Sequence, residues 1–315
     1  MNNNIFREYD IRGIADVDLD NDTVYLIGKA FGKYLIVNKH NTLSISGDVR
    51  KTTDRIKRSF IKGALSQGID VCDLGILPTP INYFSLYNTN IPNSVQITGS
   101  HNPSEYNGLK ISFNRKPFYG QDIKALQIII EKNEFISNSS LGKLFQNDIL
   151  DDYKQYMYKN IKIDKKLKVV MDCGNAVGGI IAPEIYKNLN IELEELYCDV
   201  NPDFPNHHPD PTVDSNLEDM IDIVKSGSYD VGIAFDGDAD RIVAVSDNGE
   251  IIRADILLAF FLEFIVKKGD SVVYDVKCSK SLEDVISKLG AIPLMWKTGH
   301  SLIKNKMIES KSKIG

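Results

Sequence analysis

The chain has 315 residues, which is too long for one ordinary hydrophobic core and indicates two or three domains. It carries 37 Lys and Arg against 43 Asp and Glu, a net charge of −6, with its basic residues scattered, so we expect neither a nucleic-acid-binding face nor a membrane-binding patch. No apolar run has the length of a membrane span, the start lacks a signal-peptide pattern, and the four cysteines lie far apart, so we expect a soluble cytoplasmic protein with reduced thiols.

Three segments share one pattern, in which an apolar run reaches an aspartate and then turns polar or small. Each predicts a buried strand that ends in a loop. Apolar residues spaced three and four apart follow each segment and predict an amphipathic helix, and a second strand comes next. The first strands are expected at 43–48, 168–175 and 271–279, the helices at 56–65, 181–189 and 282–289, and the second strands at 68–75, 190–197 and 290–296.

Strand, helix and strand three times over predict three similar α/β units with parallel strands and crossover helices. A polar segment at 138–148 and a hairpin-like Asn248-Gly249 turn mark the boundaries, which gives domains 1–146, 147–250 and 251–315. The third unit holds only its opening elements, so the chain looks cut short.

The stretch 229–249 is the sharpest chemical signal. An apolar strand delivers Asp236, Asp238 and Asp240 to a small-residue loop, and three hard oxygen ligands suit Mg²⁺. An EF-hand needs Gly and Glu where this chain has Arg241 and Asp247, and strands rather than helices flank the loop. A solvated acidic turn is the other interpretation, but three like charges so close together would repel without a cation.

The loop Thr98–Pro103 follows a second strand-like run and carries Ser100 and His101. Its place at the carboxyl end of a strand is where open α/β sheets bind ligands. A serine hydrolase would need Gly-x-Ser-x-Gly and a base from elsewhere, and His101, adjacent in sequence, is badly placed to be that base. A phosphate carrier and a plain Asn-Pro turn both stay open.

Several motifs together resemble one family. The loops "TGSHNP" at 98–103, "NGLK" at 107–110 and "DGDADR" at 236–241 look like the phosphoserine and metal loops of the α-D-phosphohexomutases. "FREYDIRG" at 6–13, "DVKCS" at 275–279 and "WKTGHSLIK" at 296–304 are similar to the bacterial phosphomannomutase/phosphoglucomutase branch. The resemblance spans essentially the whole chain, with the motifs in the family's order.

The resemblance implies repeated three-layer αβα domains with mixed, mainly parallel sheets, here with the third domain incomplete and the fourth absent. It implies an isomerase that interconverts hexose 1-phosphate and hexose 6-phosphate, of mannose or glucose, through a phosphorylated Ser100 and a bisphosphorylated sugar. A sugar 1,6-bisphosphate would be the activator. One Mg²⁺ would bind the Ser100 oxygen and the carboxylates of Asp236, Asp238 and Asp240.

The resemblance also implies roles for cationic residues. Arg12, His101, Lys110 and Arg241 match acid/base or charge-stabilising positions, and Lys110 could take a sugar hydroxyl proton if nearby cations lower its pKa. The alternatives are a solvated Lys110 at a strand start and an Arg12 paired with Asp10 or Glu8.

Arg12, Lys277 and His300 match substrate-binding positions. His300 could instead cap the following helix or lie exposed. His207 and His208 have no partners at metal spacing and indicate a proline-stiffened linker.

Family members continue past this chain into a glycine-rich sugar loop and a fourth domain. We therefore expect a chain that is phosphorylated on Ser100 and binds Mg²⁺ but turns over poorly without a separately encoded C-terminal fragment. Phosphoglucosamine mutase, a non-catalytic mutase remnant acting as a binding module, and a metal-dependent serine hydrolase are the alternatives. The preferred sugar and the oligomeric state stay open.

Overall fold

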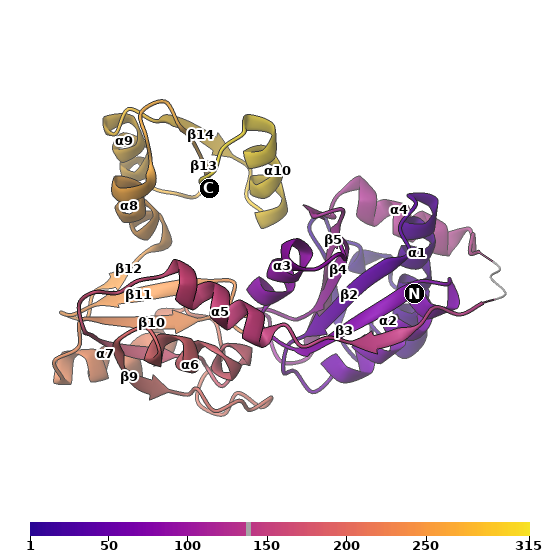
Figure 1. Ribbon diagram of the computed structural model, residues 1–315, viewed down its shortest axis with the longest axis horizontal. Coiled ribbons are helices and arrows are strands. Elements are labelled where there is room, and N and C mark those ends of the chain that lie inside the picture. The colour runs from indigo at the N-terminus through magenta and orange to yellow at the C-terminus, as the bar shows by residue number, and fades with distance from the viewer. Residues whose placement is uncertain (137–139) are drawn as a thin grey trace.

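A computed structural model describes residues 1–136 and 140–315. Residues 138 and 139 of the predicted boundary segment lie outside the described residues. The chain forms three parts, each with its own sheet (Figure 1). We keep domains 1–146, 147–250 and 251–315 as a proposed division, which one sheet in each range supports.

The first part is built on a sheet with the order β1-β5-β4-β2-β3-β7, to which β6 adds beside β5. Strands β4, β2, β3 and β7 run parallel, whereas β5 is antiparallel to β1 and β4. Its elements are η1 Asn3–Ile5, β1 Ile11–Ile14, α1 Asn21–Val37, β2 Thr42–Gly47, α2 Thr53–Ser66, β3 Asp70–Ile76, α3 Thr79–Asn88, β4 Ser94–Ile97, β5 Tyr106–Phe113, β6 Lys116–Pro117, α4 Gln121–Glu131 and β7 Leu144–Gln146.

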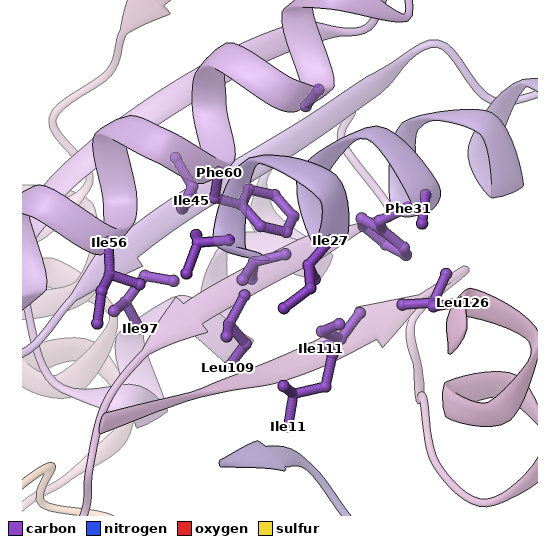
Figure 2. Packing of buried hydrophobic residues seen from close by; sticks show 14 of the residues in the cluster. Ile11, Ile27, Phe31, Ile45, Ile56, Phe60, Ile97, Leu109, Ile111 and Leu126 are labelled. Atoms are coloured by element: carbon purple, nitrogen blue, oxygen red, sulfur yellow. The ribbon is translucent and has the colours of Figure 1, made fainter. Parts of the chain in front are cut away.

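Helices α1 and α2 cover one face of this sheet and bury its largest apolar core. Figure 2 shows Ile27, Phe31 and Phe60 of the helices packed over strand residues such as Ile45 and Leu109. The two helices approach closely because Gly28 faces Phe60, where a Cβ would lie 2.2 Å from the Phe60 carbonyl oxygen. Each buried side chain of this size contributes roughly 1.5–3 kcal/mol, so this core anchors the loops at the sheet's edge.

The second part has the sheet order β12-β11-β10-β8-β9, in which β10, β8 and β9 are parallel and β10, β11 and β12 are antiparallel. The predicted hairpin turn at Asn248-Gly249 joins β11 to β12, and Gly249 takes the left-handed φ of +83° that the turn needs. Its elements are α5 Leu150–Asn160, β8 Leu167–Asp172, η2 Val177–Ile180, α6 Ala182–Lys187, β9 Ile191–Leu196, η3 Asp214–Leu217, α7 Glu218–Ser226, β10 Val231–Phe235, β11 Ile242–Ser246 and β12 Ile251–Ile252.

A separate apolar cluster joins the first two parts. Leu77 and Ile81, at the start of α3, pack with Ile149 beside α5 and with Ile181 and Ile185 at α6. This contact fixes the carboxyl edge of the first sheet against the carboxyl edge of the second, which is where the predicted serine and metal loops leave their strands.

The third part consists of α8 Ala254–Ile265, β13 Ser271–Asp275, α9 Lys280–Lys288, β14 Ile292–Trp296 and α10 His300–Ser310. Strands β13 and β14 are parallel, and α8 and α9 lie on one side of them with α10 on the other (Figure 1). Helix α10 faces the first part (Figure 1). The three predicted strand–helix–strand units are therefore present, as β2-α2-β3, β8-α6-β9 and β13-α9-β14.

The second crossover helix is shorter than predicted. A 3-10 turn precedes α6, and the helix ends at Lys187 because Asn190 takes a left-handed φ of +64° just before β9. Within residues 1–136 and 140–315, no helix combines the length and apolar character that crossing a membrane requires.

Candidate active site

Ser100 lies in the loop after β4, at the carboxyl edge of the first sheet, and is almost fully buried. Its backbone takes a left-handed φ of +50°, which a non-glycine residue rarely adopts, and its amide donates to Thr98 Oγ1 at 2.8 Å. Its hydroxyl donates to Asp236 Oδ2 at 2.8 Å. The strained turn therefore points the hydroxyl out of the first part and at the metal loop of the second.

The His101 ring reaches Ser100 after all, so the expectation that sequence adjacency keeps it away is wrong. His101 Nδ1 lies 3.2 Å from Ser100 Oγ. Burial lowers the pKa of His101 to about 4, and the charge of Arg241 adds to the shift. The imidazole is therefore neutral at pH 7 and able to accept a proton at this position.

Arg50, which follows β2, anchors the Ser100 loop to the first part. Its side chain is only 2% exposed and donates to four backbone carbonyl groups of that loop. The acceptors are the oxygens of Ser100, Asn102, Pro103 and Tyr106, at 2.8, 2.6, 2.6 and 3.0 Å. Asp48 completes the arrangement, since its carboxylate lies 3.4 Å from Arg50 Nε and accepts the Gly99 amide at 3.1 Å.

The predicted metal loop, residues 236–241, follows β10 and folds back on itself. Asp236 Oδ1 accepts the amides of Asp240 and Arg241, both at 3.1 Å, and Ala239 takes a left-handed φ of +55°. Gly237 is required by close approach, because a Cβ there would lie 2.3 Å from the Ser100 carbonyl oxygen. The loop thus packs directly against the serine loop, and the carboxylates of Asp236, Asp238 and Asp240 each offer an oxygen within 4.8 Å of the others.

Lys110 lies in the middle of β5 and is buried, so a solvated lysine at a strand start is wrong. Its Nζ donates to Asp238 Oδ2 and Asp240 Oδ2, both at 2.6 Å. Burial acts to lower the pKa of Lys110, but the carboxylates of Asp238 and Asp240 outweigh it and raise the pKa. The lowered pKa that a proton-accepting Lys110 would need is therefore not what its surroundings produce.

The three carboxyl groups of the acidic cluster share one ammonium, that of Lys110. Burial and the neighbouring carboxylates hold the pKa of Asp236 well above its usual range. Burial opposes ionisation of Asp238 too, but the Lys110 ammonium holds its pKa below the usual range. Asp238 Oδ1 is buried without a hydrogen-bond partner among the described residues. Three carboxylates beside one ammonium, with an unused oxygen among them, fit a Mg²⁺ site.

The remaining predicted residues meet in one cavity of 940 Å³ that all three parts line. Ser100, Lys110 and Asp240 are among the residues that line it. The predicted residues Arg12, Arg241, Lys277 and His300 also line this cavity, whereas Asp236, Asp238 and His101 lie outside its wall.

For Arg12 and His300, the structure agrees with the predicted position at the cavity and also with part of the alternative interpretation. Arg12 does pair with Asp10, at 2.5 Å, as its alternative interpretation has it, and still lies on the cavity wall. His300 is exposed and begins α10, but it makes no side-chain cap and faces the cavity.

His207 and His208 lie in an irregular segment between β9 and η3, which agrees with the predicted linker, but both rings have partners that the sequence did not indicate. His207 Nε2 lies 2.9 Å from Asp172 Oδ2, at the carboxyl end of β8. His208 Nε2 lies 2.6 Å from the His101 carbonyl oxygen, so it donates across the gap to the serine loop. His208 therefore ties the serine loop to the second part, whereas His207 binds Asp172 within the second part.

The sequence offered only weak signals for the residues it missed. Arg50 follows a strand that ends in Asp48, and Asp172 ends a strand of the same pattern, so both occupy the edge where function was expected. Thr79, whose hydroxyl donates to Asp238 Oδ2, gives no signal because its partner is far away in sequence.

The chain matches three family models in order. Their descriptions are phosphoglucomutase/phosphomannomutase alpha/beta/alpha domain I over residues 3–137, domain II over residues 150–249 and domain III over residues 253–315. Together these matches cover most of the chain.

Three of the curated relatives that match this chain are named as phosphomannomutases or phosphoglucomutases. A phosphomannomutase/phosphoglucomutase from Pseudomonas aeruginosa is 41% identical over 308 residues, 97% of this chain and 66% of the relative. A phosphoglucomutase from Neisseria meningitidis is 38% identical, over 96% of this chain and 66% of the relative. A phosphomannomutase from Vibrio cholerae is 32% identical, over 96% of this chain and 68% of the relative. This chain thus spans about two thirds of the length of the relatives it matches.

Among solved structures, a phosphoglucomutase/phosphomannomutase family protein from Burkholderia thailandensis superimposes with a TM-score of 0.92 at 36% identity. The match covers 99% of this chain and 70% of that protein.

Proposed function

Since the chain belongs to the phosphoglucomutase/phosphomannomutase family of α-D-phosphohexomutases, we propose that Ser100 carries a phosphoryl group and exchanges it with a hexose phosphate. The single observation that carries the proposal is the Ser100 hydroxyl, held 2.8 Å from Asp236 in a loop whose Ser100 lines a cavity with several basic residues. The relatives are named for mannose and glucose phosphates, and we propose these sugars for this chain.

In the forward step, Ser100 Oγ attacks the phosphorus of a sugar 1,6-bisphosphate and the bond from phosphorus to the sugar oxygen breaks. The products are phosphoserine and a hexose monophosphate. In turnover, the free 6-hydroxyl of a hexose 1-phosphate attacks the phosphoserine, which frees Ser100 Oγ and gives a sugar 1,6-bisphosphate. Ser100 Oγ then attacks the phosphorus at position 1, the bond from that phosphorus to the sugar oxygen breaks, and hexose 6-phosphate leaves. A sugar 1,6-bisphosphate is therefore both the intermediate and the proposed activator.

The residues around Ser100 suit this exchange. Neutral His101, 3.2 Å from Ser100 Oγ, is placed to accept the hydroxyl proton as the oxygen attacks. Asp236, Asp238 and Asp240 with the Ser100 oxygen would hold Mg²⁺, which when bound adds positive charge beside the phosphoryl oxygens.

The cations of the cavity neutralise the charge of the transferring group. Lys110 stays protonated between its two carboxylates, so we assign it charge stabilisation rather than proton acceptance. Arg12 and Arg241 line the cavity from the first and second parts and can donate to phosphoryl oxygens. Lys277 and His300 reach it from the third part, and we assign them to substrate binding.

The test is phosphate incorporation from glucose 1,6-bisphosphate in the presence of Mg²⁺, followed by mass spectrometry of the intact chain and its peptides. We expect one phosphoryl group on Ser100, none on the Ser100→Ala chain, and unchanged labelling of a Ser104→Ala control in the same loop. An unlabelled parent chain would overturn the proposal and favour a non-catalytic binding module.

A further inference from the structure

Lys304 lies on the wall of the cavity although no expectation pointed to it. It follows His300 by one turn of α10, so both side chains project from the same helix face toward the first part. Lys304 lines the 940 Å³ cavity together with Ser100 and Arg12, and it also lines an adjoining cavity of 440 Å³. Lys304 is therefore shared by the walls of two cavities, one of which is the proposed substrate site.

Two other cations that line this cavity already have carboxylate partners. Arg12 contacts Asp10 at 2.5 Å, and Lys110 contacts Asp238 and Asp240 at 2.6 Å. Among the residues that the structure describes, no carboxylate lies within 4.0 Å of Lys304 Nζ.

The contact that Lys304 does make leaves its charge only partly compensated. Its Nζ stands 4.0 Å from the centre of the Tyr83 ring, and a ring face attracts a cation more weakly than a carboxylate does. Burial lowers the pKa of Lys304 to about 8, with Asp240 opposing the shift and Lys110 adding to it. The ammonium is thus held in a cavity wall without the anion that would stabilise its charged form.

We propose that Lys304 binds the phosphate of the sugar substrate, with its ammonium donating to phosphoryl oxygens while its stem stays on Tyr83. The proposal rests on the proposed function, because a hexose phosphate is the anion that this cavity would receive. A lysine ammonium suits this task, since it is a compact cation with donors that rotate to meet a phosphate.

The opposing explanation is that Lys304 only packs its stem and charge on an aromatic ring. The same helix offers a matched control for that role. Lys306 Nζ stands 4.2 Å from the centre of the Trp296 ring and 3.7 Å from Glu309 Oε2, and Lys306 is not among the residues lining either cavity. Replacing each lysine by methionine removes a cation from a ring face in both cases, but from the cavity in only one.

The experiment measures the rate of phosphate incorporation into Ser100 as a function of glucose 1,6-bisphosphate concentration. For Lys304→Met we expect the half-saturating concentration to rise about ten- to a hundredfold, the range of a lost hydrogen bond to a charged group. Lys306→Met should stay within about twofold of the parent, and Lys304→Arg, which keeps the charge, should recover most of the loss. Thermal unfolding of each variant checks that the helix is intact.

The outcomes separate the two proposals. A parent chain that takes no phosphate overturns the proposed function and this inference with it. A labelled parent with an equally labelled and equally saturated Lys304→Met overturns the Lys304 assignment alone. If Lys304→Met does not fold, Lys304→Arg and Lys304→Gln decide: the assignment requires saturation near that of the parent for arginine and a large loss for glutamine.

Discussion

The serine loop and the face of α10 meet at the same cavity but are held in different ways. The serine loop is anchored within the first part by Arg50 and from the second part by His208 and Asp236. The α10 face contacts the first part through the Tyr9 hydroxyl, which donates to the Thr298 carbonyl at 2.8 Å, and through Lys304 on Tyr83. The group that would react is thus fixed, whereas the groups that would bind substrate stand on a part with fewer ties to it.

The hydrophobic core that supports the serine loop is also larger and more completely buried than the core that supports α10. The serine loop rests on the large cluster of the first part, in which Phe31, Phe60 and Phe118 are fully buried. The third part has a smaller cluster, and Phe260 and Phe264 of α8 are 55% and 72% exposed. Phosphoryl transfer depends on positioning of the reacting atoms, so the chemistry sits on the more rigid support.

Removing the Arg50 side chain, which anchors the serine loop, should have the largest effect on stability. Arg50→Met leaves four carbonyl groups and the Asp48 carboxylate buried without their partner, so we expect a loss of about 3–5 kcal/mol in the free energy of unfolding. Chemical denaturation measures it. Arg58→Met, which removes a surface cation paired with Asp54, should change stability by less than about 0.5 kcal/mol. Equal effects of the two changes would mean that Arg50 does not anchor the loop.

The metal loop gives the next largest effect. Mg²⁺ at a hundred times its dissociation constant should raise the free energy of unfolding by about 2.7 kcal/mol, because it binds only the folded loop. Asp238→Asn removes the carboxylate whose second oxygen is unpaired, and the Mg²⁺-dependent rise should vanish. Asp247→Asn, an exposed change in the turn beyond β11, should retain it. Calorimetric melting with and without Mg²⁺ decides, and a rise that survives in Asp238→Asn would place the ion elsewhere.

The contact between His207 and Asp172 predicts a smaller effect on stability, one that depends on pH. Burial opposes protonation of His207, but its hydrogen bond to Asp172 outweighs burial and raises the pKa above the ordinary 6.5. The folded state therefore holds the proton more tightly than the unfolded state. The resulting stabilisation is complete below pH 6.5 and is lost as the pH rises through the raised pKa.

His207→Gln should accordingly cost about 1 kcal/mol at pH 5.5 and clearly less at pH 8.5. Denaturation curves at the two pH values measure the difference. Asp172→Asn should flatten the same dependence, because it removes the partner that raises the pKa. A pH dependence that persists unchanged in both variants would show that other groups cause it.

The smallest expected effect concerns the hydrogen bond that ties the start of α10 to the first part. Tyr9→Phe removes the hydrogen bond to Thr298 and should cost about 0.5–1 kcal/mol, with faster amide exchange at the start of α10. Tyr87→Phe removes a similar bond to the Arg115 carbonyl within the first part and serves as the control. Hydrogen exchange followed by mass spectrometry compares them. Unchanged exchange at 298–304 in Tyr9→Phe would show that other contacts hold the helix.

Much of the fold follows from local patterns in the sequence. Apolar runs ending in aspartate predicted β2, β8 and β13, and three-and-four spacing predicted the helices that follow them. The same patterns placed Ser100 and the metal loop at strand ends, where parallel sheets gather functional side chains. These features depend on residues close together in the chain, so the sequence alone could show them.

Tertiary structure decided which of these groups touch. Ser100 and Asp236 are 136 positions apart, and only the contact between the first two parts brings them to 2.8 Å. The contacts of Arg50, His208 and Lys304 left no local pattern, because each side chain meets a partner from another segment. The charge of Lys110 shows the reason most clearly. Its pKa depends on the burial and the carboxylates around it, and those surroundings exist only once the chain is folded.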